Sequence, residues 1–155
     1  MAVIGSRMLK RLPTEIIYFI ETNDAHFGLK AVARKSNKGN QEDKLRNIIM
    51  TLIEGPSYSE QQKGLSSSLP KSTKLLDLSI SGDEVTVDFS KEFLEPQGIS
   101  ASIGMLNEIY YSLSLPKSIS GVRLLVEGNP LYYLGGEGIV VEQPWRKRSD
   151  KLPRW

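Results

Sequence analysis

Apolar residues recur at every third or fourth position over residues 45–53, and this spacing predicts an amphipathic helix. Asn40 precedes the stretch as a helix cap, since its side chain can accept a hydrogen bond from the first turn. Gly55 and Pro56 follow the stretch. Glycine adopts a left-handed conformation freely and proline cannot continue a helix, so the helix is expected to end there.

A second helix and a short helical turn are predicted by similar signals. Ser57 and Glu60 have the spacing of a capping box, so a helical turn is expected to start directly after the Gly-Pro break. Residues 105–113 place their apolar side chains on one helical face, with Ser100 or Ser102 as the expected cap. The sequence therefore predicts two amphipathic helices, each with one face to bury.

Strict alternation of apolar and polar residues predicts a β-hairpin over residues 76–89, which turns at Gly82 and Asp83. Asp88 is expected to face outward, because it alternates with inward residues on either side. Phe93 and Leu94 follow the hairpin and are expected to pack beneath it. The predicted inward residues are Leu76, Leu78, Ile80, Val85, Val87 and Phe89.

Further strands are predicted before and after this hairpin. Residues 15–21 form a β-branched and aromatic run, typical of a strand buried on both faces, and residues 28–34 are expected to pair back on it. Residues 122–126 form another alternating strand, which ends at Gly128. A last hairpin is predicted over residues 131–142.

This order of elements predicts an α+β fold. Two amphipathic helices must each bury one stripe, and a mixed or antiparallel sheet offers the surface for both, which gives a two-layer sandwich. The 155 residues suit one domain with a single core. We expect a flexible arm over residues 1–14, the domain over residues 15–146, and a solvated basic tail over residues 147–155.

The sequence offers little chemistry of its own. It has no cysteine and one histidine, His26, interpreted as a surface residue of a turn. The run Ser66-Ser67-Ser68 has no base placed beside it and is interpreted as a solvated loop. The glycine-rich residues 135–138 precede a β-type segment instead of a helix, so they are interpreted as a hairpin turn and not as a phosphate loop. No catalytic residue, cofactor or metal site is predicted, and the chain is expected not to be an enzyme.

Charge and hydropathy restrict the partners. The formal net charge of +2 and the pI of about 8.8 are too mild to indicate a nucleic-acid partner. No run of about 18 apolar residues is present, so no membrane-spanning helix is predicted. Residues 1–7 are too short for a signal peptide, although an apolar start before a basic cluster fits the trimmed end of a signal or anchor.

The order and spacing of these motifs resemble the GerMN domain family, the sporulation and spore germination domain. In that family a helix ends in Gly-Pro, a loop closes on Leu-Pro or Ile-Pro, a hairpin and a second helix follow, and a strand ends at a glycine turn. The second helix of the family carries a Gln-hydroxyl pattern, for which this chain has Asn107 and Ser112. The residues that carry the motifs are Gly55, Pro56, Leu69, Pro70, Val87, Asp88, Phe93, Asn107, Tyr110 and Gly128.

The resemblance covers about residues 15–146 and implies a non-catalytic domain of bacterial envelope proteins. Members are lipoproteins or single-pass membrane proteins that face outward, and their fold is similar to the ring-building motif. It implies an assembly or scaffold function, with other envelope proteins as partners and self-association as an option. It also implies an extracytoplasmic location, with membrane association only through a segment missing from this chain.

Two other hypotheses come from different functional classes. The first is a binding module for cell-wall glycan or a small ligand, which an aromatic-lined groove would favour. The second is RNA binding, because α+β sandwiches host that function; flat salt dependence would argue against it. The aromatic residues considered for such a groove are Tyr110, Tyr111, Tyr132 and Tyr133.

Overall fold

The computed structural model describes residues 14–24, 26–36 and 38–155. The predicted arm therefore lies outside the described residues, apart from Thr14. Thr14 is the first residue of β1 (Thr14–Thr22). Strand β1 pairs antiparallel with β2 (Phe27–Lys35), and this confirms the predicted hairpin. One face of β1 is fully buried at Ile17 and Phe19, whereas Ile16 and Tyr18 on the other face are half-buried. Ile20, on that other face, is 4% exposed, so both faces of the strand are covered as predicted, and the face of Ile17 and Phe19 is the more deeply buried.

Helix α2 (Gln41–Glu54) begins and ends where the sequence predicts. Asn40 Oδ1 accepts from the Asp43 N–H at 2.9 Å, and the Asp43 carboxylate accepts from the Asn40 N–H at 3.3 Å. Gly55 ends the helix with φ of 89°, a conformation that side chains with a Cβ rarely adopt. The buried face of α2 is the predicted one, formed by Leu45, Ile48, Ile49, Leu52 and Ile53.

The predicted turn after the Gly-Pro break is helix α3 (Tyr58–Gln62), with the capping box in place. The Glu60 carboxylate accepts from the Ser57 N–H at 2.8 Å, and the Arg34 guanidinium donates to both of its oxygens at 2.6 and 2.7 Å. These charge-assisted hydrogen bonds from Arg34, more than any other contact, lower the pKa of Glu60 to about 2. Glu60 therefore ties α3 to β2.

The serine run is not simply a loop, and this corrects the prediction. Leu65 and Ser66 form the short strand β3 (Leu65–Ser66), which pairs with β1 through Ile20 and Glu21. The N–H and C=O groups on the edge of β1 need hydrogen-bond partners, and the backbone of β3 supplies partners at Ile20 and Glu21. Ser67 Oγ then donates to the Leu52 carbonyl oxygen at 2.8 Å, which fixes the run against α2.

The hairpin of β4 (Leu75–Ser81) and β5 (Glu84–Phe89) is confirmed, with one change on β4. The pairing shifts between Leu75 and Asp77, because a bulge lies there. Leu75 therefore pairs with Phe89, while Leu76 is 49% exposed instead of inward. A bulge inserts one extra residue into a strand, so the side chains before and after it no longer alternate in one continuous pattern. Counting every second residue back from Leu78 therefore assigns Leu76 to the wrong face of the sheet.

The chain then forms the 3-10 turn η1 (Lys91–Leu94) and helix α4 (Ile99–Leu113). Phe93 is fully buried as predicted, but Leu94 is 45% exposed, because adjacent residues of a 3-10 turn point about 120° apart. The predicted serine caps of α4 are wrong. Gly98 occupies the cap position without a side-chain hydrogen bond, and Ser100 and Ser102 lie inside the helix.

Strand β6 (Gly121–Val126) lies parallel to β5 and is followed by the short β7 (Asn129–Pro130), which pairs back on β6. The strands of this sheet have the order β10-β6-β5-β4, and β10 is Trp145–Arg146. The first sheet has the order β2-β1-β3. Most of the described strands are thus divided between these two sheets, and β8 (Tyr133–Leu134) and β9 (Ile139–Val140) form a separate pair, where one sheet was expected.

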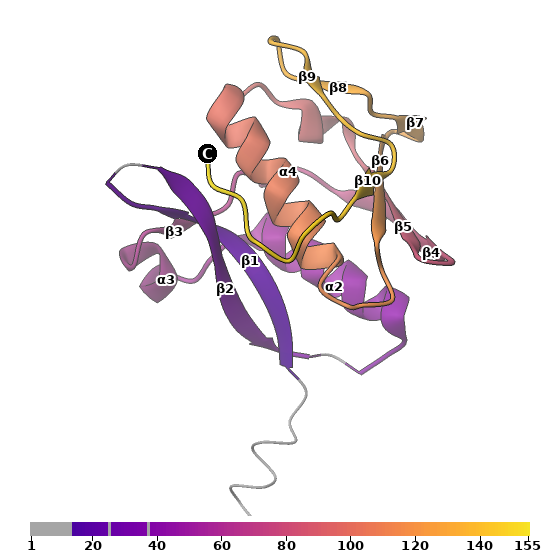
Figure 1. Ribbon diagram of the computed structural model, residues 1–155, viewed down its shortest axis with the longest axis horizontal. Helices are drawn as coiled ribbons and strands as arrows, with labels where there is room; N and C mark the ends of the chain where they lie inside the picture. Colours follow the sequence, from indigo (N-terminus) through magenta and orange to yellow (C-terminus); the bar gives the residue numbers. More distant parts are fainter. Residues whose placement is uncertain (1–13, 25, 37) are drawn as a thin grey trace, which may run out of the picture.

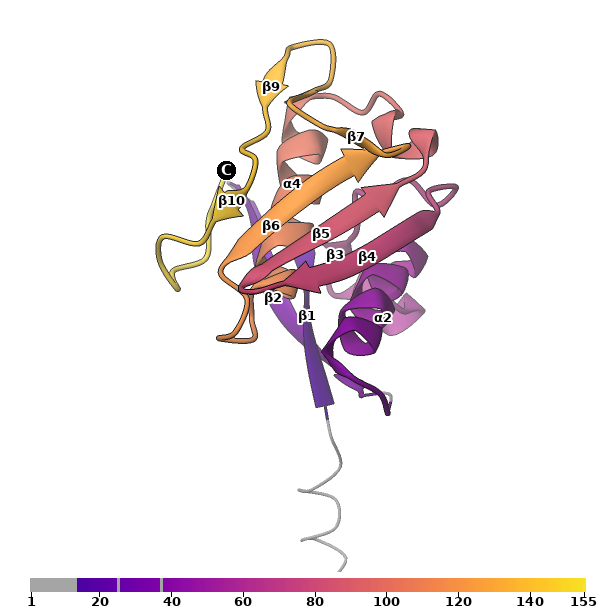
Figure 2. The same cartoon turned by 90° about the vertical axis from the view of Figure 1, so that its right-hand side faces the viewer.

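Helices α2 and α4 lie between the β2-β1-β3 sheet and the larger sheet (Figure 1). Helix α2 contacts β1 and β4, whereas α4 contacts β1 and β2 and meets β10 through the stacked rings of Tyr110 and Trp145. Figure 2 looks onto the outer face of β4, β5 and β6, which no helix covers. At Tyr18, β1 is bonded to α4, since the Tyr18 N–H donates at 3.0 Å to Ser112 Oγ. The predicted α+β class, with amphipathic helices on mixed and antiparallel sheets, is confirmed.

The last part of the chain forms the predicted hairpin of β8 (Tyr133–Leu134) and β9 (Ile139–Val140), and then packs against the rest of the fold. The expectation of a solvated tail is wrong for its end. The backbones of Trp155 and Phe27 exchange two hydrogen bonds of 2.8 and 3.1 Å, and their rings stack at 6.2 Å. Aromatic packing and main-chain hydrogen bonds hold the end of the chain against β2. The basic composition of residues 147–155 does not predict these contacts.

Candidate functional site

The described residues bring together no recognisable catalytic set. His26 Nε2 lies 3.2 Å from Asn23 Nδ2 in the turn between β1 and β2. In the described part of the chain, no group of three or more His, Asp or Glu side chains is placed to hold a metal ion. No helix in residues 14–24, 26–36 and 38–155 combines the length and apolarity needed to cross a bilayer.

The residues that carry the family motifs occupy three places in the structure. Gly55, Pro56 and Leu69 line one shallow hollow beside the end of α2, and Pro70 follows Leu69. Asp88 Oδ1 accepts from the Gly128 N–H at 3.0 Å and so closes the turn after β6. The buried members with side chains in the core are Leu69, Val87, Phe93 and Tyr110.

Tyr110 packs face to face on Trp145, with ring centroids 4.6 Å apart and planes 3° from parallel. Its hydroxyl is buried without a hydrogen-bond partner, and burial raises the pKa of Tyr110. Tyr111 meets the same indole edge-on at 5.3 Å. These two tyrosines therefore belong to the packing between α4 and β10, and they do not form the aromatic groove considered for a ligand.

Among the described residues, the buried ionisable acid of α4 is Glu108. Glu108 has no exposed surface, whereas Asn107 is half-exposed. Glu108 Oε1 accepts from the Ser68 N–H at 2.7 Å, and Oε2 has no partner. The sequence contained a signal for it, because Glu108 stands three residues after Met105 and four before Ser112, on the apolar face of the helix.

Burial raises the pKa of Glu108 well above its ordinary value, against the lowering effect of the Ser68 N–H and the Ser67 hydroxyl. Desolvation disfavours the charged form of a buried carboxyl, so the folded protein favours the neutral form of Glu108. Through the hydrogen bond from the Ser68 N–H, Glu108 joins α4 to residues 66–68, which we call the serine segment. We assign it a structural role, because its free oxygen faces the protein interior and no ligand surface.

Glu108→Gln is expected to stabilise the protein at alkaline pH. The unfolded carboxyl ionises near its ordinary pKa of about 4.3, so the wild-type protein loses stability as the pH rises above that value, until the folded carboxyl ionises too. The amide keeps an acceptor for the Ser68 N–H and cannot ionise. We expect a gain on the order of 1 kcal/mol at pH 8, read as a rise of a few degrees in Tm, and none at pH 4.

The matched control for this prediction is Glu95→Gln, which removes an exposed carboxyl. Thermal unfolding of both variants and the wild-type protein is followed from pH 4 to pH 9. The Glu108→Gln difference should grow with pH and the Glu95→Gln difference should stay small. A Tm difference for Glu108→Gln that does not change with pH would contradict a neutral buried carboxyl.

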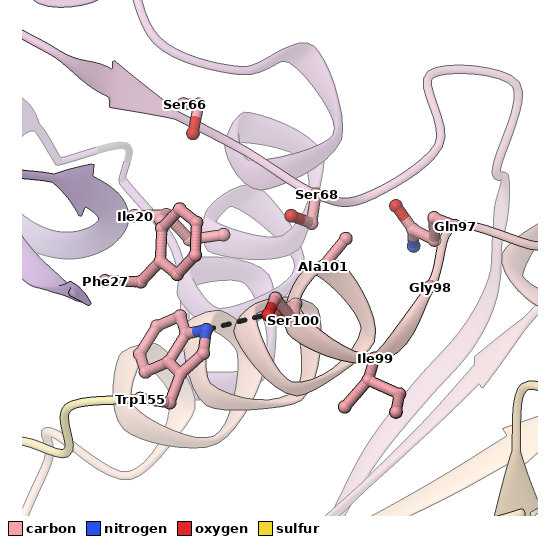
Figure 3. Close-up of a pocket in the computed structure, with 10 residues that line it drawn as sticks. All are labelled: Ile20, Phe27, Ser66, Ser68, Gln97, Gly98, Ile99, Ser100, Ala101 and Trp155. Atoms are coloured by element: carbon pink, nitrogen blue, oxygen red, sulfur yellow. Dashed lines mark hydrogen bonds between the residues drawn. The ribbon is translucent and has the colours of Figure 1, made fainter. Parts of the chain in front are cut away.

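A groove of about 420 Å³ lies where β2, the serine segment and the start of α4 meet. We call it the α4 groove; Figure 3 shows its lining residues. Phe27 and Trp155 stand on one side, and Ser66 and Ser68 come from the opposite segment. The Trp155 indole N–H donates to the Ser100 carbonyl oxygen at 3.1 Å, which fixes the ring. Its lining residues are Ile20, Phe27, Ser66, Ser68, Gln97, Gly98, Ile99, Ser100, Ala101 and Trp155.

A second surface feature is the outer side of the β8–β9 hairpin. Tyr133 and Val140 are register partners, and they are 67% and 69% exposed. Tyr132 beside them is 57% exposed. Leu134 and Val141, in contrast, are buried and anchor the hairpin in the core. We call the exposed residues Tyr132, Tyr133 and Val140 the apolar tip.

Comparisons with known proteins agree with the fold. The first GerMN domain of the sporulation protein GerM from Bacillus subtilis matches with a TM-score of 0.71 and 18% identity, over 88% of this chain and 99% of that one. The tandem GerMN domains of the same protein match with a TM-score of 0.69 and 21% identity. That match covers 86% of this chain but 44% of the tandem chain, so this chain spans less than half of it.

A putative lipoprotein from Clostridium perfringens is also similar, with a TM-score of 0.61 and 26% identity over 87% of both chains. Comparison with curated protein sequences finds no match. The profile of the Germane family, described as sporulation and spore germination, matches residues 16–132. The resemblance seen in the motifs is therefore confirmed. This chain belongs to the Germane family of sporulation and spore germination domains.

Proposed function

We propose that this chain is a non-catalytic assembly module on the extracytoplasmic side of a bacterial cell envelope, where it binds other envelope proteins. The family membership supports this proposal. Two similar structures come from a sporulation protein and from a putative lipoprotein, which supports an envelope location. The described residues offer exposed apolar side chains on the surface, which suits a protein-binding role.

The apolar tip is the observation that carries the proposal. Tyr133 and Val140 form a cross-strand pair on the open side of a two-stranded hairpin. Exposed aromatic and branched side chains that cluster in this way mark protein-binding sites, because their burial against a partner releases water. Tyrosine is enriched in interfaces since it offers a large apolar ring and a polar hydroxyl.

The hairpin presents the tip in a fixed position. Leu134 and Val141 are 3% exposed, and the Val141 N–H donates to the Tyr132 carbonyl oxygen at 2.8 Å. A side chain that is already ordered loses less entropy on binding, which favours affinity. Glu137 in the turn adds a negative charge beside the tip. The partner is therefore an envelope protein with an apolar pocket and a basic rim.

Site-specific photo-crosslinking in the producing cells tests this proposal. Tyr133 is replaced by p-benzoylphenylalanine, and Tyr58 on α3, which is 76% exposed, carries the same replacement as a matched control. We expect an adduct with one extracytoplasmic protein at position 133 and not at position 58. Mass spectrometry identifies the joined peptides.

A second substitution, Val140→Asp, should abolish that adduct, because it places a charge in the apolar contact. Either of two results would overturn the proposal: the same adducts at both positions, or an adduct at position 133 that persists in Val140→Asp. Specific turnover of a substrate by the purified chain would contradict the non-catalytic role.

A further inference from the structure

The α4 groove has the chemistry of a ligand site that the assembly role does not use. None of its ten lining residues carries an ionisable side chain: the lining consists of three serines, one glutamine, two aromatic residues and four aliphatic residues or glycines. Charged ligands therefore lack a side-chain partner of opposite sign in it. The volume of about 420 Å³ lies in the range of small-molecule sites.

One side of the groove is an aromatic wall. Phe27 and Trp155 stack with ring centroids 6.2 Å apart and planes 26° apart, and both rings line the groove. The indole N–H is already used by the Ser100 carbonyl oxygen, so Trp155 offers a ligand its ring and not its donor. An aromatic face is electron-rich and attracts weakly positive C–H groups, such as those on the flat face of a pyranose ring.

The opposite side is a polar wall that is held in place before any ligand binds. Ser67 Oγ donates to Leu52, and the Ser68 N–H donates to Glu108, so the serine segment is fixed at 2.8 and 2.7 Å. The Gln97 amide N–H donates to Met105 Sδ at 3.3 Å. Hydroxyl and amide groups can both donate and accept, which matches the hydroxyl groups of a sugar.

The main chain of the serine segment is poorly placed to bind an extended peptide. Addition of a peptide strand needs a row of unpaired backbone groups. Residues Leu65 and Ser66 already pair with β1, and the N–H of Ser68 is taken by Glu108. The side chains of Ser66 and Ser68 are what the segment offers to a ligand. This arrangement favours a saccharide over a peptide.

The groove also has room for more than one ring. A neighbouring hollow of about 360 Å³ shares Ser68 and Gln97 with it. Its lining also includes Lys71 and Glu95, one charge of each sign, so the absence of ionisable side chains applies to the α4 groove and not to this hollow. From these observations we propose that the α4 groove binds a neutral pyranose oligosaccharide, with one ring stacked on Trp155 and its hydroxyl groups bonded to Ser66, Ser68 and Gln97. The proposal goes beyond protein assembly and does not depend on the apolar tip.

Titration of the full chain with two sugars, followed by NMR of the backbone and indole N–H groups, tests the proposal. The probes are the β-1,4-linked tetramers of N-acetylglucosamine and of glucose, which share the pyranose chemistry and differ in the acetamido group. We expect shifts confined to residues 66–69, residues 97–101 and the Trp155 indole, with at least one of the two sugars.

Variants identify the contacts. Trp155→Ala should weaken binding about tenfold or more, and Ser68→Ala, which keeps the N–H bonded to Glu108, about threefold. Tyr58→Ala is the matched control, an exposed aromatic residue outside the groove, and should bind as the wild-type protein does. Since Trp155→Ala also removes packing, Ser68→Ala gives the independent test.

The proposal is overturned if neither sugar causes shifts at about 10 mM, a concentration that detects even weak binding. It is also overturned if the shifts lie elsewhere on the surface, or if Ser68→Ala and Trp155→Ala both bind as tightly as the wild-type protein. Binding of an unrelated extended peptide in the groove, without sugar binding, would assign the groove to the other ligand class.

Discussion

Phe93→Ala is expected to lower the free energy of unfolding by about 3–5 kcal/mol, because it leaves a cavity of aromatic size in the core. Phe93 is fully buried and stacks on Phe89 with ring centroids 4.3 Å apart and planes 4° from parallel. The substitution removes the apolar burial and the ring contact together, and the rigid strand β5 cannot collapse into the space. Urea denaturation of the two proteins measures the loss.

The adjacent residue provides the control for Phe93. Leu94 occupies the same 3-10 turn but is 45% exposed, so Leu94→Ala should cost about 0.5 kcal/mol or less. Similar losses for the two variants would contradict the assignment of Phe93, and not Leu94, to the core.

Gly104→Val is expected to produce the second large effect, a loss in the free energy of unfolding of about 1–3 kcal/mol from overpacking and the displacement of Trp155. A Cβ at this position would lie 2.6 Å from Ile20 Cδ1 and 3.0 Å from Trp155 Cζ2. The end of the Ile20 side chain can move, but the indole is fixed by its stacking on Phe27 and by the Ser100 carbonyl oxygen. The added methyl groups therefore force the tail away from α4.

Two readouts separate this effect from a general loss of helix stability. Calorimetry gives the loss in stability, and NMR of the Trp155 indole N–H reports whether the ring has left its site. Gly136→Val is the control, because a Cβ at Gly136 meets no atom within 4 Å. An unchanged Trp155 indole signal in Gly104→Val would contradict the packing of the terminal tryptophan against α4.

The sequence predicts the elements whose signals are local. The capping residue Asn40, the break at Gly55 and the turn at Gly82 all act within a few residues, and each appears where it is expected. Leu76 lies on the unexpected face because a bulge depends on pairing with β5, which alternation cannot show. Local rules therefore give the elements better than the register between them.

The candidate sites depend on contacts between residues far apart in the chain, and this limits their prediction. Trp155 contacts Phe27, although the two residues lie near opposite ends of the sequence. The indole ring fits against α4 because Gly104 has no side chain there. Composition suggests only a basic tail there. Glu108 could have been found from its position on the apolar face of α4, but its link to Ser68 comes from tertiary packing. The motif order nevertheless identified the family, because each motif is local.

The affinity of the partner captured at position 133 tests the assembly role most directly. That partner is purified and titrated by calorimetry with the wild-type chain, with Tyr133→Asp and with Tyr58→Asp. We expect Tyr133→Asp to weaken binding at least about tenfold, because it removes an aromatic anchor that the partner buries, and Tyr58→Asp to bind as the wild-type chain does. Equal affinity of all three proteins would contradict the apolar tip as the assembly surface.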